Sequence, residues 1–149
     1  MEDQALLDML NAGVEGMIPF VARTGFEIVD AGRGHCTARL PLEPNVNHVG
    51  FMYAGALYTL AEVPGGVVAM TTFDPASTYP LVKEMTIRFS KPARSAISVS
   101  VSLSEDEIER VEREVAERGK SDWSWTCELT NEDGEVVCVT ENQYQLRSR

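Results

Sequence analysis

The sequence is poor in the residues that build metal and disulfide sites. Its 149 residues include only three cysteines and two histidines. The cysteines show no Cys-x-x-Cys spacing and no accompanying histidine pattern, so a metal site is not supported. An odd number of irregularly spaced cysteines is typical of a reducing compartment rather than of a disulfide framework. We therefore expect no metal and free thiols.

Basic residues are also scarce. The chain has 13 Lys and Arg against 23 Asp and Glu, which gives a formal net charge of −10. An acidic surface repels nucleic acid and anionic lipid, so we expect neither as a partner, and any anionic ligand needs a local basic patch. The start of the chain, Met1–Gln4, lacks the basic residues and apolar core of a signal peptide. We therefore expect a cytoplasmic protein.

Several familiar motifs are absent. There is no G-x-G-x-x-G, no P-loop and no G-x-S-x-G, and the alternating rhythm of a Rossmann-type sheet is missing. The length is close to the commonest domain size and suffices to bury a core without stabilising disulfides or metal ions. We expect a single domain over residues 1–149.

One long stretch stands out because it is almost free of charge. Residues 49–73 contain a single formally charged side chain, Glu62, in a protein whose residues are otherwise 24% charged. A run that is apolar on every face is either a membrane span or a buried helix. Pro64, Gly65 and a mid-run carboxylate argue against the membrane, where a charge is costly. The run predicts a buried central helix. A single carboxylate inside such a helix requires a structural or functional explanation.

The rest of the chain predicts an antiparallel sheet. Two short strands, 26–30 and 35–40, precede the central helix, and the regular alternation of 97–103 marks the clearest of four strands after it. The others are 81–89, 122–129 and 136–144. A packing helix is expected over 3–18, and a charged surface helix over 104–120. The pattern predicts an α+β fold with a curled antiparallel sheet around one long central helix.

The residues near that helix resemble those of a known family. Asn47 and Gly50 precede Tyr53-Ala54-Gly55, and Leu60-Ala61-Glu62 places an acid fifteen positions after Asn47. The later segment 85–93 resembles the family's strand that ends before Pro-Ala. On these residues the chain resembles a hotdog-fold acyl-CoA thioesterase, most closely the phenylacetate-pathway branch, whose His-Gly-Gly here reads Tyr53-Ala54-Gly55. The resemblance implies a hotdog fold, with the N-terminal helix and the charged helix as additions.

The resemblance also implies a reaction, the hydrolysis of a coenzyme A or acyl-carrier thioester. Glu62 would act as base or nucleophile, and Asn47 would orient the carbonyl or the water. The backbone N–H of Ala54, beside Gly55, would stabilise the oxyanion, since a helix N-terminus favours developing negative charge. A carboxylate in apolar surroundings has a raised pKa and is a better base near neutrality. No cofactor is implied, because coenzyme A is part of the substrate.

Further residues are candidates for binding the substrate. Arg88, Lys91 and Arg94 gather near the end of one predicted strand and could hold the phosphates of coenzyme A. The substrate-binding candidates nearer the central helix are His48, Phe51, Met52 and Tyr53, of which Phe51 and Met52 could line an acyl tunnel. A single sheet around one helix leaves an open edge, so we expect a homodimer or a dimer of dimers with the site between subunits.

Three alternatives stay open. Glu62 could be a structural carboxylate paired with Arg88 or with a partner subunit. Tyr53-Ala54, in place of His-Gly, fits an acyl-binding hotdog module without turnover. His48 stands fourteen residues before Glu62, the separation in hotdog-fold hydroxyacyl thioester dehydratases, but their His-Phe-Pro and Pro-Gly signals are absent.

Overall fold

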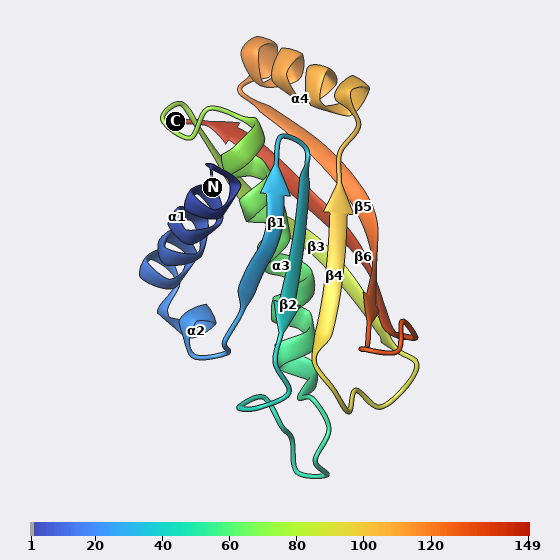
Figure 1. The fold of residues 1–149 in the computed structure, drawn as a ribbon. Coiled ribbons are helices and arrows are strands. Elements are labelled where there is room, and N and C mark those ends of the chain that lie inside the picture. The colour runs from blue at the N-terminus through green and yellow to red at the C-terminus, as the bar shows by residue number, and fades with distance from the viewer. Residues whose placement is uncertain (1) are drawn as a thin grey trace.

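The computed structural model describes residues 2–149, which form four helices and six strands. All strands belong to one sheet of order β1-β2-β4-β5-β6-β3, in which every neighbouring pair is antiparallel (Figure 1). The elements in chain order are α1 (Glu2–Met17), α2 (Pro19–Ala22), β1 (Glu27–Gly32), β2 (His35–Leu40), α3 (Ala54–Thr72), β3 (Thr78–Phe89), β4 (Ile97–Ser102), α4 (Glu105–Arg118), β5 (Lys120–Thr130) and β6 (Val136–Ser148). The predicted α+β architecture, with a central helix between two strands and four, is confirmed.

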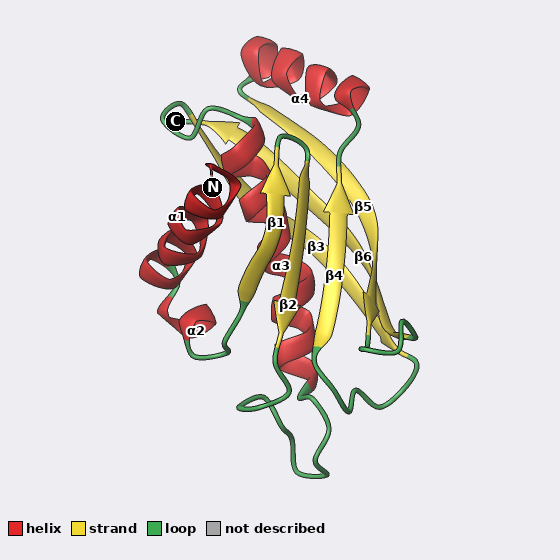
Figure 2. Ribbon diagram, viewed as in Figure 1, coloured by secondary structure: helices red, strands yellow, loops and turns green. Residues whose placement is uncertain are grey.

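Helix α3 lies against one face of the sheet and contacts all six strands (Figure 2). Leu60, Ala61 and Val68 are completely buried, as the uncharged run predicts. The helix begins at Ala54 and not earlier in the run, because Tyr53 is extended and Gly50 has a positive φ of 85°. Among the residues described, no helix is both long and apolar enough to cross a membrane.

The N-terminal helices flank the sheet at β1. The side chain of Asn11 on α1 clamps that strand, since it accepts from the backbone N–H of Ile28 (2.8 Å) and donates to the carbonyl of the same residue (3.0 Å). The short helix α2 is absent from the sequence prediction. Pro19, which ends the predicted first helix, also begins this second one, because proline is well suited to the first turn.

Helix α4 covers one end of the sheet beside the β1–β2 turn. Ser104 caps it by accepting from the N–H of Glu107 (3.2 Å), and its Ile108 and Val111 are completely buried. Arg33 in the turn pairs with Glu105 at the start of the helix (3.1 Å). The charged helix is therefore amphipathic, with one stripe contributing to the core.

Strand β3 forms one edge of the sheet and pairs only with β6. It begins at Thr78, earlier than predicted, because an edge strand tolerates Pro80 with one side unpaired. Lys83 lies at a β-bulge between Val82 and Glu84, so the alternation of inward and outward side chains changes phase there. This bulge is the physical cause of the break at Lys83 in the sequence pattern.

Candidate active site

Glu62 lies in the middle of α3, on the stripe that the sheet leaves partly open. Tyr58, Glu62, Gly66 and Met70 recur at intervals of four and so share one face, and none of the four is fully buried. Among residues 2–149, no hydrogen-bond donor or cation reaches the Glu62 carboxylate. Burial raises the pKa of the Glu62 carboxyl above its ordinary value. An unpaired, half-buried carboxylate of this kind is suited to accept a proton near neutrality.

Two polar side chains from β6 hold the turn of α3 that carries Glu62. The hydroxyl of Tyr144 donates to the carbonyl of Glu62 (3.0 Å), and Asn142 Nδ2 donates to the carbonyl of Ala61 (3.0 Å). Pro64 has no N–H to donate to the carbonyl of Leu60 four residues earlier, which weakens the helix just before this turn. The two donors from β6 bind the carbonyls of the next two residues and fix the backbone under Glu62.

Gly65 allows Tyr144 to approach α3 closely enough for these hydrogen bonds. A β-carbon at Gly65 would collide with the ring of Tyr144, so only glycine admits the ring against the helix. Tyr144 is buried and stacks on Trp123, with ring centroids 5.6 Å apart. Burial also raises the pKa of Tyr144 well above its usual range, so the hydroxyl stays protonated and remains a donor.

The N-terminus of α3 presents unused backbone donors. The first two residues of the helix, Ala54 and Gly55, have no intrahelical acceptor for their N–H groups, and no loop carbonyl of the described chain accepts from them. Tyr53 at the N-cap offers no side-chain cap; its own N–H donates to the carbonyl of Asn45 (2.7 Å), and its ring lies over Gly55. The free N–H groups can bind an oxyanion.

Asn47 organises the loop before the helix. Its Oδ1 accepts from the backbone N–H groups of Val49 (2.9 Å) and Phe51 (3.1 Å), and its own N–H donates to the carbonyl of Phe51 (2.7 Å). Oδ1 is thus engaged within the loop, while Nδ2 has no partner among the residues described. In this arrangement Asn47 can offer a substrate a donor but not a free acceptor.

A pocket of about 360 Å³ opens at this end of α3. It brings together five of the predicted site residues, with Phe89 of β3 on the opposite wall. The five are Asn47, Phe51, Met52, Ala54 and Lys91. His48 is exposed in the loop, does not line this pocket and makes no hydrogen bond with the rest of the described chain.

The three predicted basic residues do not form one patch. Arg94 lies over the ring of Phe51, 4.9 Å from its centroid, and Lys91 lines the pocket while pairing with Glu135 (2.6 Å). Arg88 is in register with Val139, so it projects from the outer face of the sheet, opposite α3. No ion pair joins Arg88 to Glu62 in the described residues. This excludes the alternative in which Arg88 of the same chain is the structural partner of Glu62.

The oxyanion donor and the carboxylate lie far apart on one helix. Ala54 and Glu62 are separated by eight residues, which correspond to about 12 Å along the axis of an α-helix. A single thioester carbonyl cannot contact both backbone positions directly, because each contact requires about 3 Å, so within one chain the Glu62 side chain and a bridging water would have to span the remaining distance. Within one chain the structure therefore brings together the pocket residues around Ala54 but leaves Glu62 apart from them.

Other candidate chemistries find little support. Burial raises the pKa of the Cys36 thiol to about 12 and that of Cys138 to about 11, so both stay protonated and unreactive near neutrality. All three cysteines are free and buried. Across the described chain, no three His, Cys, Asp or Glu side chains gather as a metal site requires.

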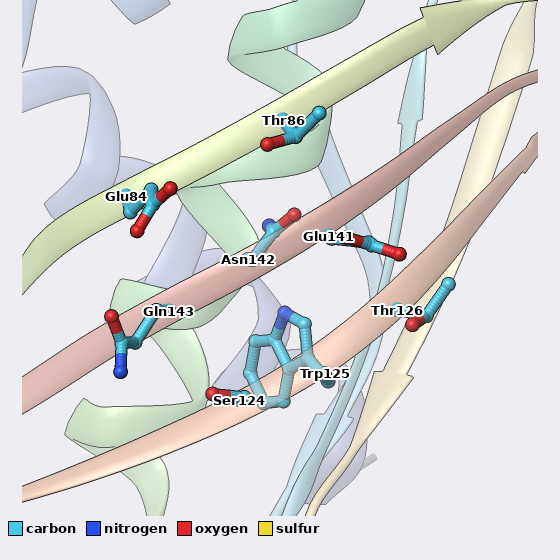
Figure 3. Close-up of a pocket in the computed structure, with 8 residues that line it drawn as sticks. All are labelled: Glu84, Thr86, Ser124, Trp125, Thr126, Glu141, Asn142 and Gln143. Carbon is cyan, nitrogen blue, oxygen red and sulfur yellow. The ribbon is translucent and has the colours of Figure 1, made fainter.

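A second hollow, of about 420 Å³, lies on the outer face of the sheet, with α3 behind the strands (Figure 3). The side chains that open into it are polar, and two of them, Glu84 and Glu141, are carboxylates on neighbouring strands. It faces away from Glu62 and from the helix N-terminus. We therefore place the candidate active site on the α3 face.

Sequence reasoning missed Asn142 and Tyr144. Two signals could have found them. Pro64 inside a buried helix weakens the helix at the preceding turn, and Asn142 falls on the inward-facing register of its strand, where a polar side chain needs a partner. A polar side chain that faces a proline-interrupted helix is the donor that such a helix needs.

The structure is similar to those of thioesterases. It matches a Pseudomonas aeruginosa protein described as a probable thioesterase at 45% identity, over 95% of each chain, with a TM-score of 0.89. A thioesterase of Haemophilus influenzae (17% identity, 95% of this chain and 90% of that one, TM-score 0.73) shares the fold. So does a mutant thioesterase of P. aeruginosa (19% identity, 96% and 94%, TM-score 0.73). The protein therefore has the hotdog fold of these thioesterases, as the resemblance predicts.

Within this class the chain belongs to a defined family. It matches the family described as "Domain of unknown function (DUF4442)" over residues 8–146, nearly its full length. No curated protein matches the sequence. The hotdog-fold resemblance is thus confirmed at the level of fold and family, while the phenylacetate-pathway branch stays a prediction.

Proposed function

We propose that this protein hydrolyses an acyl thioester of coenzyme A or of an acyl carrier, in the manner of the phenylacetate-pathway thioesterases. The observation that carries the proposal is Glu62, the lone carboxylate of a buried helix, unpaired and with a raised pKa. Relatives of the same fold are described as thioesterases, and one of them is 45% identical. A structural carboxylate would be expected to have a partner, and within the described chain Glu62 has none.

The reaction follows from the groups at the two ends of the site. As a base, the Glu62 carboxylate takes a proton from water, and the resulting hydroxide attacks the thioester carbonyl. The oxyanion of the tetrahedral intermediate accepts from the free N–H of Ala54 at the positive end of α3. When the carbon–sulfur bond breaks, the proton returns from Glu62 to the leaving thiolate. As a nucleophile, Glu62 would instead attack the carbonyl directly, and water would hydrolyse the resulting anhydride.

The separation of Ala54 and Glu62 leads us to place the site between two copies of the chain. In a twofold dimer with antiparallel α3 helices, the Ala54 N–H of one copy faces Glu62 of the other, and the arrangement occurs twice. The exposed edge of β3, with Leu81 and Val82 partly uncovered, supports a homodimer joined at this edge. Lys91 and Arg94, beside the helix N-terminus, would then face the coenzyme A phosphates.

A thiol-release assay over a panel of acyl-CoAs tests the proposal. The wild type should turn over at least one acyl-CoA, and Glu62→Gln should lower kcat by about 10²–10⁴-fold, as for loss of a general base. Activity should rise with pH through the raised pKa of Glu62, because the ionised carboxylate is the active form. Wild-type rates no higher than those of Glu62→Gln on every member of the panel would remove the enzyme assignment.

A non-catalytic acyl-binding module is the second candidate. Tyr53, which stands in place of the family histidine, covers Gly55, and Asn47 Oδ1 is occupied by loop N–H groups. Both features reduce the polar groups available to a reacting carbonyl. Calorimetric binding of acyl-CoA by the wild type, without thiol release above the Glu62→Gln background, would favour this function.

A further inference from the structure

A hollow of about 310 Å³ lies on the α3 side of the sheet, beyond Glu62 towards the C-terminal end of the helix. Gly66, Ala69 and Met70 of α3 form one wall, and the start of β3 and the α1–α2 junction form others. In Figure 1 the helix α1 runs beside β1, and the C-terminus lies close to the loop that follows α3. The remaining lining residues are Met17, Ile18, Pro75, Thr78, Pro80, Leu146 and Arg149.

The lining offers a ligand few hydrogen bonds, and those that remain free belong mainly to the guanidinium group of Arg149. Of its two polar side chains, Thr78 donates its hydroxyl to the carbonyl of Asp74 (2.7 Å), and Arg149 donates Nε to the carbonyl of Pro75 (3.2 Å). The other lining residues are apolar or glycine, and the two methionines can adapt to a flexible ligand. The chemistry that fits is hydrocarbon.

Three elements lead from this hollow to Glu62. On α3, Gly66 lies one turn from Glu62 on the same face, and a β-carbon at Gly66 would meet no atom within 4 Å. On β3, inward-facing Pro80 of the hollow is followed by Val82, which is in register with Tyr144. On β6, Leu146 of the hollow follows Tyr144, the donor to the Glu62 carbonyl, on the same face of the strand. The hollow thus lies next to the turn that carries the carboxylate.

We propose that this hollow receives the hydrocarbon end of the acyl group, and that the substrate is therefore a straight-chain aliphatic thioester. The inference rests on the proposed function for the position of the thioester at Glu62. From Glu62 to Met70 the path is eight residues, or about 12 Å along the helix axis. An extended aliphatic chain fits such a path, whereas an aromatic acyl group would leave its far end empty.

Calorimetry with S-alkyl-CoA thioethers tests the hollow without requiring turnover, since these ligands have no carbonyl to hydrolyse. With the wild type, affinity should rise about fourfold per added methylene until the hollow is full, and then level off. Gly66→Leu should abolish this gain for the longer chains and leave the methyl thioether unchanged. Gly16→Leu is the matched control, because Gly16 is also helical and open to solvent but does not line the hollow.

A second pair of variants guards against a folding defect. Met17→Trp narrows the hollow from the side of α1, and Met9→Trp places the same residue on the same helix outside it; the two methionines are 62% and 63% exposed. Met17→Trp should lose the length dependence and Met9→Trp should keep it. An unchanged length dependence in both hollow variants, or none in the wild type, overturns the inference. If Gly66→Leu loses the dimer by light scattering, Met17→Trp decides the test, because Gly66 shares the face of Glu62 that meets the partner copy in the proposed dimer.

The same length series of acyl-CoAs in the thiol-release assay separates this inference from the proposed function. Turnover without length dependence overturns the acyl hollow and retains the thioesterase. Length-dependent binding without turnover retains the hollow and removes the thioesterase. Tight binding of the S-(2-phenylethyl)-CoA thioether, with no gain along the alkyl series, replaces the aliphatic ligand by an aromatic one.

Discussion

At the scale of single residues, Glu62 combines a proposed catalytic use with a cost in stability. The folded state raises the pKa of this carboxyl by burial, so the folded protein holds the proton more tightly than the unfolded chain, whose glutamates titrate near about 4.3. The free energy of unfolding therefore falls as the pH rises from the pKa of Glu62 in the unfolded chain through its higher pKa in the folded protein. A group that destabilises the fold in its ionised form is common at active sites.

The variant Glu62→Gln removes this cost. Its free energy of unfolding, relative to the wild type, should be constant below the pKa of unfolded glutamate, increase as the pH rises through the raised pKa, and then level off. Denaturant titrations at a series of pH values measure the difference. Glu141→Gln, on the outer face of the sheet, controls for the change in net charge. A Glu62→Gln difference that does not vary with pH would contradict the assignment of a raised pKa.

Gly65 and Gly66 give a second test at this scale. Gly65→Ala forces a methyl group against the ring of Tyr144, which is buried and cannot retreat, so it should destabilise the protein by about 1–3 kcal/mol. Gly66→Ala meets no atom and should stabilise it by roughly 0.5–1 kcal/mol, since alanine is the better helix former. Thermal or denaturant unfolding measures both. Equal effects would show that Tyr144 does not pack on α3 as described.

At the scale of elements, the N-terminus of α3 can be altered without losing the helix. Ala54 is the first helical residue, where proline is favoured, and Tyr53 before it has φ −59° and ψ 138°, which a following proline accepts. Ala54→Pro removes one N–H and should lower kcat by about 10²–10³-fold, as for loss of an oxyanion donor. Far-UV circular dichroism should stay unchanged. Ala54→Gly keeps the N–H and should retain activity; if it lost as much activity as Ala54→Pro, the cause would be packing instead.

Sequence patterns predict the elements better than their mutual placement. Glu62 is visible in the sequence as the one charge in an uncharged run, and so is the helix α3 that carries it. The position of Arg88 is not, because it depends on the register of β3 after the bulge at Lys83, which tertiary pairing with β6 decides. The roles of Asn142 and Tyr144 likewise depend on which strand lies under Pro64.

At the scale of the whole molecule, the central question is whether one copy of the chain contains a complete site. The open edge of β3 and the distance of about 12 Å between Ala54 and Glu62 both favour a twofold assembly. Size-exclusion chromatography with light scattering should find at least a dimer. A monomer at the assay concentration, with full activity, would contradict the composite site.

Mixed dimers decide which copy supplies which group. When inactive Ala54→Pro and inactive Glu62→Gln chains are refolded together in equal amounts, half of the dimers are mixed, and each has one intact pair if Ala54 and Glu62 act across the interface. The mixture should then regain about a quarter of the wild-type activity. If each site used groups of one chain, the mixture would stay inactive. Wild type refolded in equal amounts with the double variant Ala54→Pro/Glu62→Gln gives the opposite ranking. A site shared between copies should then retain about a quarter of the wild-type activity, and a site within one chain about half.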